Sequence, residues 1–130
     1  LLFVAIMWLS TAPLMQDDVE AAEARPLTET EQMFANAQGF EDLTNIVPGR
    51  CAMCHAREPF YDGIHRAPKG LLLETPADIA RAARQIYLQA GVTNAMPPAN
   101  VSFMEEEERR KIMRWYRDGA ANQPFSLAGK

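Results

Sequence analysis

The stretch Cys51-Ala52-Met53-Cys54-His55 determines how the rest of the chain is interpreted. Two cysteines three positions apart, followed directly by a histidine, form the attachment signature of a c-type haem. On one helical turn the two thiols lie on one face, where each can form a thioether with a haem vinyl group. His55 can then ligate the iron from the proximal side. The chain has no other cysteine, so we expect one covalent haem c held by Cys51, Cys54 and His55.

Other uses of the two cysteines agree less well with the spacing. A structural zinc site needs four ligands, and the only other histidine, His65, is ten residues beyond His55. A thioredoxin-like dithiol belongs to a βαβ context, and no neighbouring segment alternates like a strand. A simple disulfide in an exported domain is the remaining alternative. His65 as a second axial ligand would have to reach the opposite haem face, so we interpret it as an exposed loop residue.

Length and charge restrict the possible classes of protein. The chain has 130 residues, which allows one domain plus the N-terminal segment. Residues 40–119 contain eleven acidic and eleven basic side chains, so no basic face stands out and nucleic acid is not an expected partner. A domain of this size has a marginal core by itself, and a covalent haem is the kind of apolar supplement that it needs.

The N-terminal segment, residues 1–15, carries no charge. As a helix it would span roughly 22 Å, less than the ~30 Å hydrocarbon core of a bilayer. We interpret it as the C-terminal part of a transmembrane helix, with a signal-peptide apolar region and a buried core segment as alternatives. The acidic residues that follow favour the non-cytoplasmic side. Residues 16–37 are predicted to be a linker with a short helix, which starts at a capping box formed by Thr28 and Glu31.

Residues 38–122 are predicted to form the folded domain, and residues 123–130 a flexible tail. Capping residues and apolar spacing predict helices over 40–47, 75–91 and 102–119, which end at Pro48-Gly49, Gly91 and Gly119. Residues 56–74 are rich in proline and glycine and are predicted to be a loop. In the helices, Arg81, Arg84 and the basic residues from Arg109 to Arg117 are expected to face solvent, in part as ion pairs four residues apart.

Two further residues are candidates for the haem site. An iron-bound histidine normally donates its other ring N–H to a carbonyl, and we predict that the Pro68 carbonyl accepts it, an ordinary turn proline being the alternative. Met96 precedes Pro97-Pro98, which impose extended geometry on the chain. Because a thioether is a suitable ligand of haem iron, Met96 is the predicted sixth ligand. The other methionines of the domain region are expected to fill the core or, for Met53, to face away from the haem.

The order of these features resembles that of small class I cytochromes c. The resemblance covers about residues 38–120 and is strongest at Cys51, Cys54, His55 and Met96. It implies an all-α fold around the haem, in which the first and last helices pack against each other. The implied contact joins Phe40 and Leu43 to Trp115 and Tyr116.

A narrower resemblance is to the C-terminal cytochrome c domain of bacterial membrane-bound urate oxidases. It is carried by residues 38–40, 50–51, 67–70, 86–91, 95–98 and 114–116. It implies an electron-transfer module without its own catalytic site, fused to an upstream membrane oxidase domain and lying on the periplasmic side of the bacterial inner membrane. Electrons from urate would then pass to a respiratory-chain acceptor. A stand-alone membrane-anchored carrier, and a haem enzyme or gas sensor with a labile Met96, are the alternatives.

Overall fold

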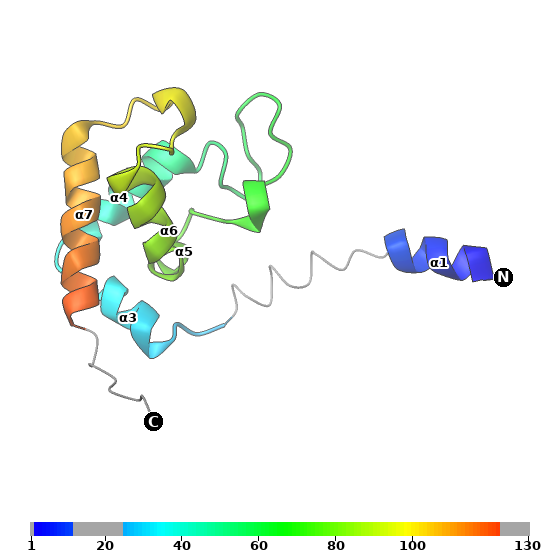
Figure 1. Ribbon diagram of the computed structural model, residues 1–130, viewed down its shortest axis with the longest axis horizontal. Coiled ribbons are helices and arrows are strands. Elements are labelled where there is room, and N and C mark those ends of the chain that lie inside the picture. Colours follow the sequence, from blue (N-terminus) through cyan, green and yellow to red (C-terminus); the bar gives the residue numbers. More distant parts are fainter. Residues whose placement is uncertain (1, 12–24, 123–130) are drawn as a thin grey trace.

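The computed structural model describes residues 2–11 and 25–122, which form helices and irregular segments without any strand. The all-α prediction is therefore confirmed for this part of the chain (Figure 1). The apolar N-terminal residues form helix α1, Leu2–Thr11. Within the described ranges, no helix has both the length and the apolar character needed to span a bilayer. Residues 12–15, residues 16–24 of the predicted linker and the predicted tail at 123–130 lie outside the described residues.

Helix α3, Glu29–Ala35, begins at the predicted capping box. The Thr28 hydroxyl accepts a hydrogen bond from the Glu31 N–H at 3.3 Å, and the Glu31 carboxylate accepts one from the Thr28 N–H at 2.7 Å. Phe34 at the end of the helix and Ala37 just beyond it are buried in the core. This helix of the predicted linker is therefore packed together with the rest of the domain.

Helix α4, Phe40–Cys51, is longer than the sequence indicated. The predicted end at Pro48-Gly49 is wrong, because the helix continues through both residues to the first cysteine. Pro48 has no N–H to donate to the Thr44 carbonyl, which normally weakens a helix. The apolar face of α4 outweighs this cost, since helices in proteins are held mainly by packing; its buried residues are Leu43, Ile46 and Val47.

Three short helical segments follow the long loop. Helix α5, Pro76–Arg81, starts at the predicted Thr75 cap, whose side chain accepts from the Asp78 N–H. Helix α6, Ala83–Ile86, and the π-helix η2, Tyr87–Val92, continue in nearly the same direction. One continuous helix was predicted here, so the segmentation is a difference from the expectation. A π-helical turn is rare and often occurs at functional sites.

Two predictions about this region are wrong. Gly91 does not end a helix but lies within η2, where an added Cβ would be 3.1 Å from Met113 Cγ and 3.2 Å from Ile112 Cγ2. Its small size allows η2 to lie close to the last helix. The Arg81 side chain is only 17% exposed and lies 3.7 Å from the Asp78 carboxylate, whereas Arg84 is exposed as predicted.

The last helix, α7, spans Glu106–Ala121. Its capping box is formed by Glu105 and Glu108, so the predicted cap at Ser102 is wrong. Phe103 has a φ of +56°, a left-handed conformation that a helix starting at Ser102 could not contain. Ser102 is instead buried.

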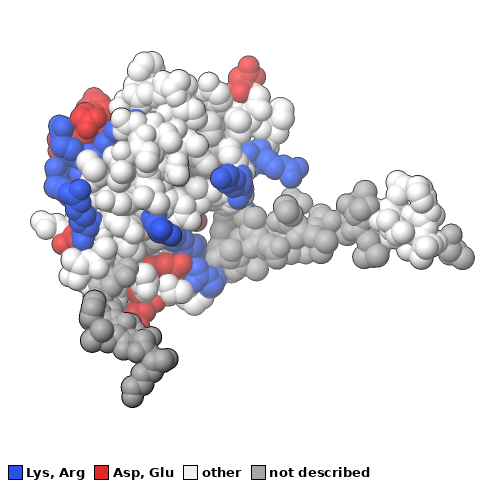
Figure 2. Space-filling view, viewed as in Figure 1, with Lys and Arg blue, Asp and Glu red and all other residues white. Residues whose placement is uncertain are grey.

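Charged residues on α7 pair differently from the predicted four-residue spacing. Glu107 contacts Arg110 and Arg114, each at 2.9 Å, and Lys111 reaches Asp42 of α4 at 3.1 Å. Figure 2 shows charges of both signs gathered along this helix, beside a broad uncharged surface. These exposed pairs contribute little to stability individually.

Aromatic packing fixes α7 at the centre of the domain. Trp115 is fully buried, and its indole N–H donates to the Phe34 carbonyl at 2.9 Å. The Phe40 and Trp115 rings lie 6.1 Å apart, which confirms the predicted contact between the first and last helices of the domain. Tyr116 stacks instead on Tyr87 at 4.1 Å and on Phe34 at 5.1 Å.

Gly119 lies inside α7 and does not end it as predicted. A Cβ at this position would lie 2.4 Å from Phe34 Cδ1, so the helix can lie against α3 only because residue 119 has no side chain. With α3, α4 and η2 packed around α7, the loop that follows α4 and the loop that precedes α7 lie at one end of the domain (Figure 1).

Candidate cofactor site

A cavity lies between these two loops and the end of α4. It contains about 620 Å³ of space that no protein atom fills, part of it open to solvent. Its walls are apolar except for one guanidinium, one imidazole and one phenol. The lining residues are Arg50, Cys51, Met53, Cys54, His55, Tyr61, Ile64, Pro68, Met96, Pro97, Pro98 and Val101.

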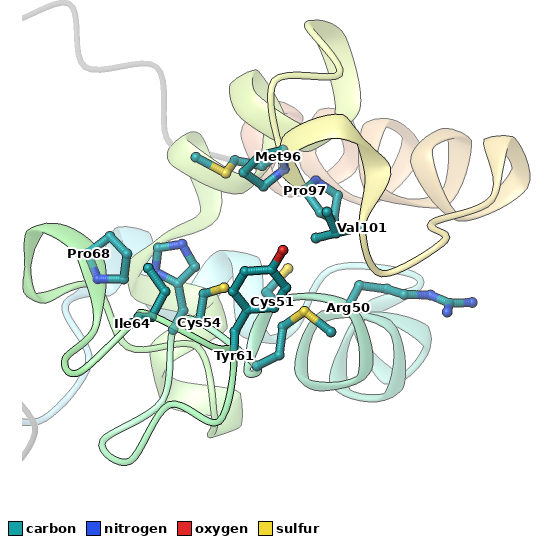
Figure 3. Close-up of a pocket in the computed structure, with 12 residues that line it drawn as sticks. Arg50, Cys51, Cys54, Tyr61, Ile64, Pro68, Met96, Pro97 and Val101 are labelled. Carbon is teal, nitrogen blue, oxygen red and sulfur yellow. The ribbon is translucent and has the colours of Figure 1, made fainter.

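The predicted attachment residues come together on one wall. Cys51 is the last residue of α4, and its carbonyl accepts hydrogen bonds from the N–H groups of Cys54 at 3.2 Å and His55 at 2.9 Å. The helix therefore ends in a tight turn that brings all three side chains to the cavity. Figure 3 shows Cys51 and Cys54 on the same side of the cavity.

The His55 ring is oriented by a backbone carbonyl, as the general rule for metal-binding histidines predicts, but the acceptor is not the predicted one. Its Nδ1 lies 2.9 Å from the Leu71 carbonyl oxygen, while the Pro68 carbonyl accepts from the Leu71 N–H at 3.2 Å. The prediction for the Pro68 carbonyl is wrong because the turn at Pro68–Gly70, with Lys69 at a φ of +56°, uses that carbonyl internally. The Pro68 ring still lines the cavity.

This hydrogen bond selects one tautomer of the imidazole. Because a carbonyl can only accept, His55 Nδ1 carries the proton, so that in the neutral ring Nε2 is the nitrogen with the free lone pair. Within the described residues, no protein group is hydrogen-bonded to Nε2. The His55 carbonyl also accepts from the Leu73 N–H at 2.8 Å, so the ring is fixed from both the side chain and the backbone. The imidazole is thereby prepared to act as a neutral nitrogen ligand.

The environment of Cys51 disfavours a thiolate. Burial raises the pKa of its thiol to about 12; the neighbouring Cys54 acts in the same direction, and the charge of Arg109 opposes it. A redox-active dithiol or a zinc thiolate site requires a thiolate that forms readily. Both cysteines are free thiols, and the described residues contain no group of three His, Cys, Asp or Glu side chains placed to hold a metal ion.

Met96 lies on the opposite wall. Figure 3 shows Met96 and Pro97 on one side of the cavity, facing Cys54 and Pro68 on the other. The Met96 N–H donates to the Gln89 carbonyl in η2 at 2.8 Å, which connects the loop to the helical segment before it. The structure thus brings the predicted thioether to the same cavity as the predicted imidazole.

The other histidine and two further methionines can be compared with their predicted positions. His65 is exposed and does not line the cavity. Met104 is buried in the core as predicted. Met53 lines the cavity, contrary to the expectation that it faces away.

Sequence reasoning also missed a buried arginine behind the Met96 wall. Arg109 is 5% exposed, and its Nη1 donates to the Ala90 carbonyl at 2.6 Å and to the Met96 carbonyl at 3.0 Å. The acidic residues before it suggested a solvent-exposed ion pair. Its helical spacing to Ile112 and Tyr116, three and seven residues later, was the signal that it lies on the inward face.

The side chains present are compatible with a covalently attached haem. One wall offers two thiols and an imidazole of suitable tautomer, the facing wall offers a thioether, and the lining between them is apolar. Comparisons of this chain with protein-family models, with curated proteins and with solved structures found no match.

Proposed function

We propose that this chain is an electron-transfer domain of the class I cytochrome c type. The observation that carries the proposal is the pairing across one cavity of the Cys51–His55 wall with Met96. Two thiols spaced for a c-type haem, an imidazole held by a carbonyl and a thioether opposite form the donor set of a low-spin electron carrier.

Each residue has a definite role in this proposal. Cys51 and Cys54 would hold the haem through their sulfurs, His55 would bind the iron through Nε2, and Met96 would supply a thioether ligand. The haem, when bound, supplies a one-electron couple at its iron. The Leu71 carbonyl keeps the imidazole in one tautomer and orientation. The apolar walls, including Pro68, would limit the contact of the haem with water and so influence its reduction potential.

Because both His55 and Met96 would bind the iron, the donor set favours electron transfer over chemistry at the metal. A haem enzyme or gas sensor is the alternative function, and it requires Met96 to leave the iron readily. These two functions differ in the response of the purified protein to an external ligand such as carbon monoxide.

A wider proposal concerns the protein to which the domain belongs. From the resemblance at residues 38–40, 67–70 and 95–98, we infer that it serves a membrane-bound urate oxidase and passes electrons from urate to a respiratory-chain acceptor on the periplasmic side. The apolar α1 supports attachment to a membrane. A stand-alone anchored carrier has the same domain chemistry, and only the oxidase distinguishes the two.

The domain proposal is tested by producing the chain in a host that attaches haem c. We expect a coloured protein whose pigment remains bound in acidic acetone, and the double variant Cys51→Ser/Cys54→Ser to lose it. Met96→Ala should lower the midpoint potential and allow the reduced protein to bind carbon monoxide, whereas the control Met33→Ala, outside the cavity, should do neither. A colourless wild-type protein, or an unchanged spectrum in Met96→Ala, contradicts the proposal.

The wider proposal has its own test. The full-length protein that contains this domain, in anaerobic membranes, should show reduction of the haem c absorption on addition of urate. The isolated domain should show none. Reduction that is absent in the full-length protein, while the domain remains redox-active toward a chemical reductant, rejects the urate assignment alone.

A further inference from the structure

Arg109 is the one arginine of α7 whose whole side chain is buried in the described structure. Its guanidinium donates to the Ala90 carbonyl at 2.6 Å, to the Met96 carbonyl at 3.0 Å and, at 3.4 Å, to the Asn100 side-chain oxygen. All three partners belong to η2 and the loop that carries Met96. One side chain of α7 therefore holds the chain on both sides of the predicted iron ligand.

The acceptors of Arg109 are neutral, and no carboxylate in the described part of the chain forms an ion pair with it. The nearby acidic side chains are engaged elsewhere: Glu108 binds the Arg50 guanidinium at 3.0 Å, and Glu105 caps its own helix. Burying a charge without a counter-ion is costly. A neutral residue would fill the same space at lower cost, so the position calls for a specific explanation.

The π-helical turn explains how these bonds are possible. In η2 the Ala90 carbonyl is directed to Arg109, and the Gln89 carbonyl accepts from the Met96 N–H at 2.8 Å. Asn100 continues the connection, because its side chain exchanges two hydrogen bonds with the backbone of Met104 at 2.9 and 3.1 Å. The Met96 loop, which contains only the short 3-10 helix η3, Pro98–Asn100, is thus tied to Arg109 at two points, Met96 and Asn100.

We propose that Arg109 is the positioning residue of the Met96 ligand, holding the thioether at the iron and, through its uncompensated charge, favouring the reduced form of the site. This inference rests on the proposed function. A haem held at this site would carry one unit less of positive charge in its reduced form than in its oxidised form. A fixed cation in a poorly screened environment stabilises that state relative to the oxidised one.

Three variants separate the two contributions. Arg109→Gln removes the charge and most of the donors, and Arg109→Lys keeps the charge but loses the planar fork that reaches two carbonyls. Arg110→Gln is the matched control, because its neighbour Arg110 is exposed and contacts only Glu107. The measurements are the midpoint potential, the affinity of the oxidised protein for imidazole, which competes with the thioether, and amide hydrogen exchange across residues 96–104.

We expect imidazole to bind about tenfold more tightly or better to both Arg109 variants, because each loses hydrogen bonds from a charged donor to the loop. The midpoint potential should fall in Arg109→Gln and stay closer to the wild-type value in Arg109→Lys. Exchange at residues 96–104 should rise in both variants but not at residues 51–56. Arg110→Gln should match the wild type in all three measurements.

The result that overturns the inference is a lower thermal stability of both Arg109 variants with unchanged imidazole affinity, potential and exchange, which would make Arg109 merely structural. If Arg109→Gln does not fold, Arg109→Lys alone decides the positioning role. A wild-type protein that takes up no haem rejects the proposed function, whereas the exchange measurement still decides whether Arg109 holds the loop.

Discussion

The cavity wall that carries Cys51 and His55 is one continuous stretch of chain, whereas the wall that carries Met96 is assembled by residues from elsewhere. The first wall is the end of α4 and the turn that follows, closed by hydrogen bonds to the Cys51 carbonyl. The second is an irregular loop held by Arg109 of α7 and by the Asn100 side chain. The two walls therefore depend on different parts of the molecule.

This difference teaches which wall is more easily disturbed. Covalent attachment and a helical turn secure the first wall in the proposed haem protein, so variants at a distance should leave it in place. The second wall has few bonds of its own, and loops with little regular structure open at lower free-energy cost than helices. We therefore expect Met96 to be lost as a ligand before His55 under most perturbations.

The largest effect should follow from a change in the packing of α7 against α3, because α7 supports both walls. Gly119→Ala places a methyl group 2.4 Å from Phe34 Cδ1, and overpacking of this kind should lower the free energy of unfolding by about 2 kcal/mol, despite the better helix propensity of alanine. Urea denaturation measures it. Gly49→Ala in α4 is the control, because its Cβ meets nothing within 4 Å; it should be neutral or stabilise by up to about 1 kcal/mol. Equal effects of the two changes would contradict the packing of α3 against α7.

A smaller effect, confined to the Met96 wall, is expected for Asn100→Ala. It removes the two hydrogen bonds to Met104 and places alanine at a φ of +51°. The free energy of unfolding should therefore fall by about 1 to 2 kcal/mol. Asn100→Gly keeps the backbone conformation accessible and should cost less. Hydrogen exchange should increase at residues 96–104 and not at 51–56. An increase of similar size on both walls would show that they are not independent.

The converse variant, Glu108→Gln, acts on the end of α4. Burial raises the pKa of Glu108, but hydrogen bonds from Arg50 and from the Glu105 N–H outweigh it and the net pKa is lowered. Its stabilising effect is present above the ordinary carboxyl pKa of about 4.3 and is lost as the pH falls through the lower folded value. At pH 7 the free energy of unfolding of the variant should be lower than that of the wild type by about 1 kcal/mol. The control is Glu106→Gln at an exposed site. Below pH about 4 the free energies of unfolding of the wild type and of Glu108→Gln should approach each other, and a constant difference between them would contradict the linkage.

The smallest effect is expected outside both walls. A hydrogen bond from Arg25, opposed by burial and assisted by the Thr28 backbone, lowers the pKa of Glu31 from 4.5 to about 2. The stability that this pair contributes is complete above pH 4.5 and disappears as the pH approaches 2. Glu31→Gln can keep the capping box while removing the charge, so its thermal midpoint should fall less than that of the wild type across this interval. The absorption spectrum of the proposed haem should be the same in this variant as in the wild type.

The starts of α3 and α5 and the turn from Cys51 to His55 could be predicted because they depend on residues within one turn of each other. The caps at Thr28 and Thr75 each need a partner three residues away, and the spacing from Cys51 to His55 is equally local. The place of Met96 beside the cavity also agrees with the prediction, which rested on the two prolines that follow it and impose extended geometry.

Positions that depend on distant partners were predicted incorrectly. The sequence pattern ended α4 at Pro48, but burial of its apolar face continues the helix to the cavity. The His55 partner is Leu71 instead of Pro68, since the choice depends on which carbonyl the turn at Lys69 leaves free. Arg109 was assigned to solvent because its local neighbours are acidic, although its partners lie 13 and 19 residues away.

The sequence by itself determined the helical class, the caps of α3 and α5 and the chemical groups available to a cofactor, because these follow from residue types at short spacing. Only the tertiary structure decided that the imidazole and the thioether face one cavity, which carbonyl orients the imidazole, and that a buried cation holds the Met96 loop. The physical reason is that packing of α7 against the rest of the domain selects among backbone arrangements that local interactions leave nearly equal in free energy.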